Sequence, residues 1–368
     1  MEPEMTLDAP DFRRMLAAPP LVTGHLPGIG GAIKAIPEHF QVEEVLPYTP
    51  SGEGEHVFMK LRRAGWNTAD VGAALGEIFG LKGADIGWGG RKDKNAVTIQ
   101  TFSLRLPMDM PLTTVEARLR SLPFDVIELQ RHGNKLKTGH VASNRFRIVV
   151  SEPEPEAGAR AGAIAAVLKS SGVPNFYGEQ RFGYQFRNLD RAAALVRRGK
   201  ARGKREAFTV SVLQSALFNC WLTERIRRGQ FTTLLHGDVA RKTDTGGLFV
   251  VDDLEEALQR FEAGRIIYTG PIYGHKMMPA AGPAGDYEKE LLDRFGLAPA
   301  VFKPLRAPGS RRAAILHLHD LSIQTDCQGL EFTFTLPAGA YATTIMREFT
   351  RQPKQTGSDR DGQGISLP

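Results

Sequence analysis

Cysteine is scarce in this chain of 368 residues, which contains only Cys220 and Cys327. Two cysteines cannot build a disulfide framework, and on their own they cannot complete a metal site. The histidines His132, His140, His317 and His319 have no acid or cysteine at a supporting spacing. The sequence therefore predicts a reducing compartment, the cytoplasm, and no metal site.

Long hydrophobic runs are also missing. Stretches such as Ala313-Ala314-Ile315-Leu316 are far shorter than the roughly 20 apolar residues that cross a bilayer. The first residues, Met1-Glu2-Pro3-Glu4, are acidic and lack the basic and apolar regions of a signal peptide. Mean hydropathy is −0.24, which is ordinary for a globular protein. We expect neither a membrane span nor a secretory signal.

The formal net charge is +6, and eight cations lie between positions 187 and 205. They are opposed only by Asp190, and they are Arg187, Arg191, Arg197, Arg198, Lys200, Arg202, Lys204 and Arg205. Such a cluster is either a solvated helix end or a surface that contacts phosphate groups. The sequence alone leaves both readings open.

Hydrophobic periodicity predicts an α+β chain with an insertion. Strand-like stretches cover 28–36, 40–46, 55–62, 86–88, 97–106, 124–130 and 141–150, with helices expected after Asn67, over 113–122 and near 159–170. Residues 171–310 are mostly helical and rich in glycine and proline, and strands return at 313–318 and 330–335 before a final helix over 338–350. We expect a flexible segment over 1–24, one discontinuous sheet domain over 25–170 and 311–351, an inserted domain over 171–310, and a disordered tail over 352–368.

The stretch from Gly89 to Gln100 begins as a glycine turn and ends as a strand. Its single acid, Asp93, lies among Arg91, Lys92 and Lys94, and neighbouring cations favour the ionised form of a carboxylate. By itself this is the composition of a surface turn. The other motifs of the chain give it a second reading.

Several motifs, in this order, resemble those of the tRNA pseudouridine synthase D (TruD) family. They are Pro37-Glu38-His39-Phe40, Gly52-Glu53-Gly54-Glu55-His56 with Asn67-Thr68, Arg91-Lys92-Asp93-Lys94-Asn95-Ala96-Val97-Thr98-x-Gln100, Val173-Pro174-Asn175-Phe176-Tyr177-Gly178-Glu179-Gln180-Arg181-Phe182-Gly183, and Leu336-Pro337-Ala338-Gly339-Ala340-Tyr341-Ala342-Thr343 with Arg347-Glu348. The resemblance covers residues 25–350. It implies a pseudouridine synthase fold, which is a bent and mainly antiparallel sheet with helices, carrying an inserted, mostly helical TRUD-type domain.

The resemblance also implies an activity, the isomerisation of uridine 13 in the D arm of tRNA, with no cofactor and no metal. It implies that Asp93 is the catalytic acid. Phe40 and Asn144 match base- and nucleotide-contacting positions, and Phe146 matches another position of the active site. Lys34 matches a basic residue near the catalytic acid, and we expect it among the substrate-binding residues. Tyr341 stands where many relatives have phenylalanine, so a hydroxyl is added to a stacking face. We expect tRNA as the partner, no obligatory protein partner, and a monomer.

Pseudouridine formation breaks the N1–C1′ bond, turns the uracil and joins C5 to C1′. An ionised carboxylate can attack C1′, stabilise positive charge there or remove a sugar proton. The base must leave its stack to reach the acid. Basic side chains would hold the RNA backbone, and the candidates are Arg181, Arg197, Arg198 and Lys200. Glu179 with Arg181 is alternatively a structural ion pair.

Two other functions remain open at this point. The basic cluster also suits a tRNA-binding or RNA-chaperone protein in which catalysis is secondary. Asp93 and Glu43 could alternatively act as the paired carboxylates of an unrelated hydrolase.

Overall fold

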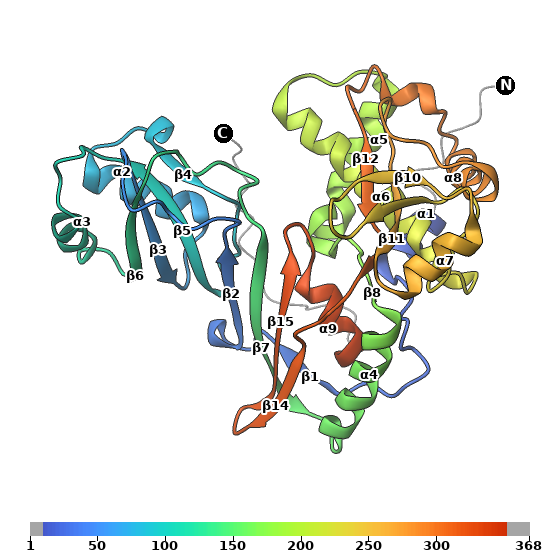
Figure 1. Cartoon of the computed structure of the whole chain (residues 1–368), viewed down its shortest axis with the longest axis horizontal. Helices are drawn as coiled ribbons and strands as arrows, with labels where there is room; N and C mark the ends of the chain where they lie inside the picture. The colour runs from blue at the N-terminus through green and yellow to red at the C-terminus, as the bar shows by residue number, and fades with distance from the viewer. Residues whose placement is uncertain (1–9, 352–368) are drawn as a thin grey trace. The chain divides into compact units, whose positions relative to one another are not determined.

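A computed structural model describes residues 10–351 of the chain (Figure 1). The chain forms two compact units, each built from segments that are distant in sequence. The first, here called the sheet unit, comprises Gly28–Ala165 and Leu318–Ala342. The second, here called the helical unit, comprises the described parts of Met1–Pro27, Ala166–His317 and Thr343–Pro368. The tail predicted over 352–368 and the first nine residues lie outside the described part.

A nine-stranded sheet forms the body of the sheet unit. Its strands are β1 (Gly30–Ile33), β2 (Phe40–Val45), β3 (His56–Arg63), β4 (Ile86–Trp88), β5 (Val97–Arg105), β6 (Asp125–His132), β7 (Ser143–Pro153), β14 (Ser322–Asp326) and β15 (Gly329–Pro337). The order is β14-β15-β7-β2-β5-β3-β6, with β1 paired to β7 and β4 paired to β5. Only the β2–β5 pair is parallel among these pairings. The predicted mainly antiparallel sheet with helices is confirmed.

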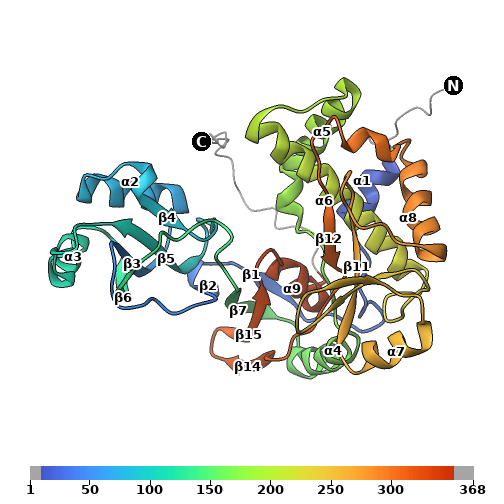
Figure 2. The same cartoon turned by 45° about the horizontal axis from the view of Figure 1, so that its top comes forward.

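Helices cover the end of this sheet that contains β3 to β6 (Figure 2). The unit holds η1 (Pro37–His39), α2 (Thr68–Phe79), η2 (Gly83–Asp85) and α3 (Leu112–Leu119), and α4 (Ala157–Ser171) begins in it. Val71 and Leu75 of α2 pack with Met59 and Phe102 in one core. The Asn67 side chain caps α2 as predicted, because it accepts from the amides of the second and third following residues.

Strand alternation sorts the side chains of β2 and β7 onto the two faces of the sheet. Phe40, Val42 and Glu44 are the buried residues of β2. In the register with β7, Val42 lies opposite Phe146 and Glu44 lies opposite Asn144. Directly paired residues point to the same face of a sheet. The buried residues of β2 therefore share one face with Asn144 and Phe146 of β7.

The helical unit carries its predicted helices and a second sheet. Its elements are α1 (Pro10–Ala17), β8 (Val173–Pro174), η3 (Glu179–Phe182), η4 (Tyr184–Phe186), α5 (Arg187–Arg198), α6 (Gly203–Arg227), β9 (Val239–Lys242), β10 (Leu248–Val250), α7 (Leu254–Glu262), β11 (Ile266–Ile272), α8 (Gly282–Arg294), η5 (Pro299–Phe302), β12 (Ser310–Ala313), β13 (Ile315–Leu316) and α9 (Ala342–Thr350). Strands β10-β9-β11-β12 form a four-stranded sheet that the sequence did not predict. These strands are short, and a short apolar run does not distinguish a strand from a buried helix.

The N-terminal segment is more ordered than the sequence indicates. We expected flexibility over 1–24, but residues 10–17 form α1, whose Phe12, Met15 and Leu16 are buried in the core of the helical unit. Their spacing places all three on one helical face. Thr23 is fully buried and donates its hydroxyl to the carboxylate of Glu348 at 2.6 Å. The C-terminal helix, α9, lies in this unit from Thr343 onward.

Candidate active site

Asp93 lies in the turn between β4 and β5, and the backbone of this turn is held at several points. The amide of Gly139 donates to the carbonyl of Gly89 at 2.8 Å, and that of Gly65 donates to the carbonyl of Lys94 at 3.2 Å. Position 89 requires glycine, because a Cβ there would lie 2.5 Å from a methyl group of Val141. The surroundings therefore fix the path of the turn on both sides of Asp93.

The Asp93 carboxylate pairs with Lys34. Lys34 Nζ lies 2.8 Å from Asp93 Oδ2, and the amide of Asn95 donates to Oδ1 at 3.2 Å. Partial burial raises the pKa of Asp93, but the charge and hydrogen bond of Lys34 and the amides of Asn95 and Lys94 outweigh it, so the pKa lies below its usual value. Asp93 is therefore ionised at neutral pH.

Sequence neighbours do not supply the charge that acts on Asp93. We expected Arg91, Lys92 and Lys94 to keep the acid ionised, but the cation in contact is Lys34, the residue that the family resemblance placed near the acid. Lys92 points instead to Glu44, with Nζ 2.7 Å from Oε2, and Lys94 contributes its backbone amide. Adjacent side chains along a turn point in different directions, so proximity in sequence gave the wrong partner.

Lys34 joins the acid to an aromatic cluster. Its Nζ lies 4.3 Å from the centroid of the Phe40 ring, a distance at which a cation–π attraction acts. The rings of Phe40 and Phe146 meet edge to face at 6.0 Å, and Phe146 lies 5.7 Å from Phe334 of β15. The backbone of Lys34 is left-handed, with φ of 60°, which is uncommon for a residue with a side chain. The chain thus accepts local strain at the residue that contacts Asp93.

Asn144 lies on the same sheet face as Phe40 and Phe146. Its Oδ1 is buried and has no hydrogen-bond partner among the described residues. Buried polar atoms nearly always have a partner, so this oxygen suits a hydrogen-bond donor from a bound molecule. Tyr341 is half-buried and follows β15. The turn before it is tied to Ala142, the residue that precedes β7, by a 3.2 Å hydrogen bond from the Ala338 amide to the Ala142 carbonyl.

A buried network beneath the turn was missed by the sequence analysis. Glu44, Arg63, Thr68, Lys92 and Gln100 are linked by hydrogen bonds and by the Lys92–Glu44 ion pair. The sequence did contain a sign of this network. Thr68 and Gln100 belong to the recognised motifs, and Glu44 is a charged residue at a buried position of the alternating strand β2. Only the fold shows that they meet.

The predicted RNA-binding residues all lie in the helical unit. Arg197 and Arg198 end α5 and Lys200 follows them, all with exposed side chains. Arg198 pairs with Glu206. Arg181 donates to the hydroxyls of Ser211 and Ser215, at 2.8 and 3.3 Å. Arg181 also lies over the rings of Tyr177 and of Phe208 in α6. These contacts are with Tyr177 and α6 rather than the alternative ion pair with Glu179.

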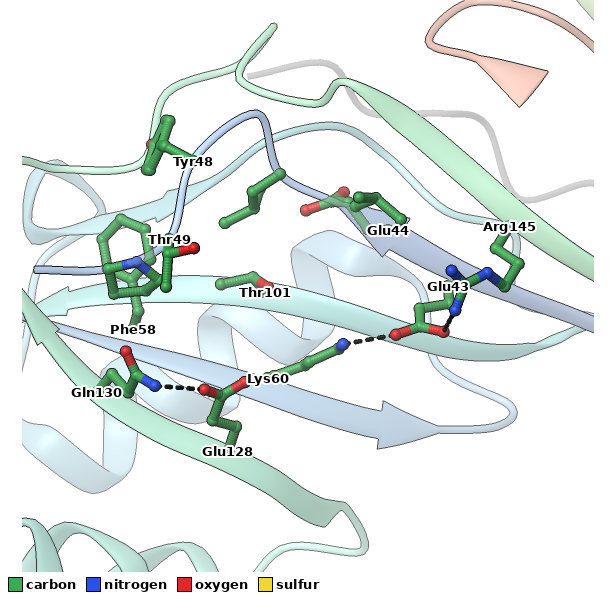
Figure 3. Close-up of a pocket in the computed structure, with 13 residues that line it drawn as sticks. Glu43, Glu44, Tyr48, Thr49, Phe58, Lys60, Thr101, Glu128, Gln130 and Arg145 are labelled. Atoms are coloured by element: carbon green, nitrogen blue, oxygen red, sulfur yellow. Dashed lines mark hydrogen bonds and ion pairs between the residues drawn. The ribbon is translucent and has the colours of Figure 1, made fainter. Parts of the chain in front are cut away.

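The pocket drawn in Figure 3 has a volume of about 280 Å³, and Asp93 is not among its lining residues. In this pocket Lys60 Nζ lies 2.5 Å from Glu43 Oε1, and a guanidinium nitrogen of Arg145 lies 3.6 Å from Glu43 Oε2. Glu43 adjoins Glu44 in β2, so it faces the opposite side of the sheet. The structure does not bring Asp93 and Glu43 together as the paired carboxylates of a hydrolase.

The described residues contain no group of three or more histidines, cysteines and acids able to hold a metal ion. Between residues 10 and 351, no helix has both the length and the apolar character needed to cross a membrane.

Comparison with known proteins identifies the family. The family model described as tRNA pseudouridine synthase D (TruD) matches residues 20–204 and 203–349. The chain belongs to the tRNA pseudouridine synthase D family. A protein named tRNA pseudouridine synthase D from Anaeromyxobacter dehalogenans (strain 2CP-C) is 41% identical over 342 residues, covering 90% of this chain and 96% of the relative. Its counterpart from Thermus thermophilus is 40% identical over 331 residues, covering 89% and 91%.

A solved structure shows the same fold. The putative tRNA pseudouridine synthase D from Methanosarcina mazei superposes with a TM-score of 0.73 at 20% identity, covering 94% of this chain and 99% of that one. Family membership makes the chain a tRNA-modifying isomerase of the pseudouridine synthase type. The predicted family and fold class are both confirmed.

Proposed function

We propose that this protein converts uridine 13 in the D arm of tRNA to pseudouridine, with Asp93 as the catalytic carboxylate. One observation carries the proposal. Asp93 is the acid that contacts Lys34, and Lys34 in turn covers Phe40. An ionised acid beside aromatic rings and an unpaired amide oxygen is suited to a pyrimidine nucleotide.

The reaction needs little beyond a positioned carboxylate. The N1–C1′ bond breaks, the uracil turns, C5 bonds to C1′, the C5 proton leaves and N1 takes up a proton from water, so no electrons are gained or lost. The ionised Asp93 acts at the sugar, either as a nucleophile that attacks C1′ or as a base that removes a sugar proton. Both roles require the low pKa that Lys34 maintains.

Side chains on the same face retain the uracil while it is detached. Phe40 and Phe146 of this face, together with Tyr341, which follows β15, border the nucleotide, and aromatic contact with a base contributes about 1–3 kcal/mol. The free Oδ1 of Asn144 accepts a hydrogen bond from the base or a sugar hydroxyl. The flipped uridine would otherwise return to its stack.

The RNA backbone binds to the basic surface of the helical unit. Arg197, Arg198 and Lys200 have exposed side chains at the end of α5. Tyr184, 75% exposed, lies near this helix, and Arg187 stacks on its ring at 5.9 Å. Cations beside an exposed aromatic ring are typical of surfaces that bind unpaired nucleotides. Arg181, which donates to Ser211 and Ser215 of α6, adds a positive charge to this RNA-binding surface.

The test uses unmodified tRNA with tritium at uridine C5. Wild type should release tritium, and Asp93→Asn should lose at least about a thousandfold in rate, because catalytic nucleophiles and bases supply effects of this size or larger. Asp109→Asn, in an exposed turn of the same unit, is the matched control. A tRNA with cytidine at position 13 should release nothing from that site. Release by Asp93→Asn equal to wild type would show that Asp93 is not the catalytic acid.

A second candidate function rests on the basic surface alone, which would suit an RNA chaperone in which catalysis is secondary. Reversing the charges of Arg197, Arg198 and Lys200 would then abolish activity in cells, while Asp93→Asn would leave it intact. Loss of activity in Asp93→Asn would instead support the enzymatic function.

A further inference from the structure

A buried ion pair lies directly beneath the turn that carries Asp93. Lys92 Nζ donates to Glu44 Oε2 at 2.7 Å, and the two side chains are 9% and 0% exposed. Forty-eight positions separate the residues in sequence. Burying both charges costs desolvation free energy that their attraction repays poorly, so such a pair is weak evidence of a stabilising role. Its place next to Asp93 suggests another purpose.

The remaining members of the network hold the same turn. Gln100 Nε2 donates to the Gly90 carbonyl at 2.7 Å and to Glu44 Oε2 at 3.3 Å. The Lys92 amide donates to Thr68 Oγ1 at 2.9 Å. Beneath them, Arg63 donates to Gln100 Oε1 at 2.7 Å. Both the backbone and the side chain of the residue before Asp93 are therefore fixed from below.

Glu44 connects these anchors because its Oε2 accepts hydrogen bonds from both Lys92 Nζ and Gln100 Nε2. It is 2% exposed. A Cβ at position 89 would lie 3.2 Å from its other oxygen, so the carboxylate packs against the glycine turn itself. Glu44 lies under the turn rather than at its solvent side.

We propose that Glu44 is a positioning residue for the reaction, a role that rests on the function proposed above for Asp93. Glu44 holds Lys92 and the turn, and thereby directs the Asp93 carboxylate toward the sugar of the bound uridine. The Asp93 side chain is 50% exposed, so its direction depends on the backbone that carries it. A displacement of about 1 Å in a reacting group costs on the order of a hundredfold in rate.

The neighbouring residue offers a matched control. Glu43 also pairs with a lysine, Lys60, at 2.5 Å, and it lies on the same strand. Its side chain is 26% exposed and faces the opposite side of the sheet. Neutralising Glu43 therefore breaks a glutamate–lysine pair whose glutamate lies on the same strand as Glu44, and it leaves the contacts that hold the Asp93 turn in place.

The experiment measures tritium release from tRNA under single-turnover conditions with enzyme in excess, together with tRNA Kd and thermal unfolding. Glu44→Gln should lower the rate constant by about 10- to 100-fold and leave tRNA Kd within about twofold. Glu43→Gln should match wild type. Lys92→Met should behave like Glu44→Gln, and the double variant should be no slower than the slower single variant, because both act through one contact.

A second pair of variants covers the case in which Glu44→Gln does not fold. Thr68→Val removes the acceptor for the Lys92 amide at nearly constant volume and should slow the reaction, whereas Thr68→Ser keeps the hydroxyl and should retain most of the rate. The inference is overturned if Glu44→Gln and Thr68→Val react like wild type, if Glu43→Gln is equally slow, or if tRNA Kd alone changes. A wild type that releases no tritium would instead contradict the proposed function.

Discussion

Lys34 and Asp93 are 59 positions apart in the chain and form an ion pair with 2.8 Å between Nζ and Oδ2. Lys34 is 14% exposed in its side chain and rests on the Phe40 ring. The lysine therefore has two neighbours, the acid and an aromatic ring. Its removal should alter both the charge of Asp93 and the surface offered to the nucleotide.

Substituting Lys34 should change the pH dependence of the reaction. Lys34→Met removes the charge that lowers the Asp93 pKa, while the partial burial that raises it remains. The activity limb that requires ionised Asp93 should move to higher pH, so the loss of rate should be largest on the acidic side of the profile. Single-turnover rates of wild type and variant between about pH 3 and 8, in ~0.5-unit steps that span the usual carboxyl pKa of about 3.9, measure this shift. Lys34→Arg keeps the charge and serves as control; identical acid limbs in all three proteins would contradict the prediction.

The same pair sets the sign of a stability effect. The Asp93 pKa is lowered by folding, so its contribution to stability is present above the unfolded pKa, near 3.9, and is lost as pH falls through the folded pKa. The difference in unfolding free energy between wild type and Lys34→Met should therefore shrink below that range. The effect is small because half of the acid side chain is exposed.

Substituting Asn144 should separate activity from stability. Asn144→Ala removes an oxygen that has no hydrogen-bond partner within residues 10–351, so the free energy of unfolding in urea should change by less than about 1 kcal/mol, while the reaction rate falls by about tenfold or more. Asn175 is the contrasting case, because its side chain donates to the Ala313 carbonyl at 2.9 Å and accepts from Arg312 at 2.6 Å. Asn175→Ala should lose about 1–3 kcal/mol of stability. A large stability loss in Asn144→Ala with unchanged activity would contradict the proposed role.

The basic surface should respond to salt. Neutralising Lys200, which is exposed, should weaken tRNA binding and reduce the slope of log K against log salt by about one for each lost phosphate contact. Arg198→Gln should have a smaller effect, since Arg198 already pairs with Glu206. Lys289→Gln on α8, also exposed, is the charge-matched control. Filter binding at several salt concentrations measures the slopes, and equal slopes for Lys200→Gln and Lys289→Gln would rule out this surface.

Local chemistry made much of the fold predictable. Asn67 and Gly80 mark the ends of α2 because an N-cap acceptor and a left-handed C-cap are local requirements. Alternation along β2 identified its buried face for the same reason. The α1 helix and the strands β9 to β11 escaped prediction because they are short, and burial against distant segments decides their structure.

The candidate site divides in the same way. The motif around Asp93, with Phe40, Asn144 and Phe146, could be recognised in the sequence because each residue type and spacing is written there. The family resemblance also placed Lys34 near the acid, and the structure has the two in contact. The partner of Lys92 was decided by the tertiary structure, because Lys92 points to Glu44 rather than to Asp93. Side-chain direction in a turn depends on the partners that surround it, and those partners come from β2, β3, α2 and β5. The sequence by itself determined the family and singled out Asp93 as the candidate acid; only the packing of these distant segments determined what holds Asp93 in place.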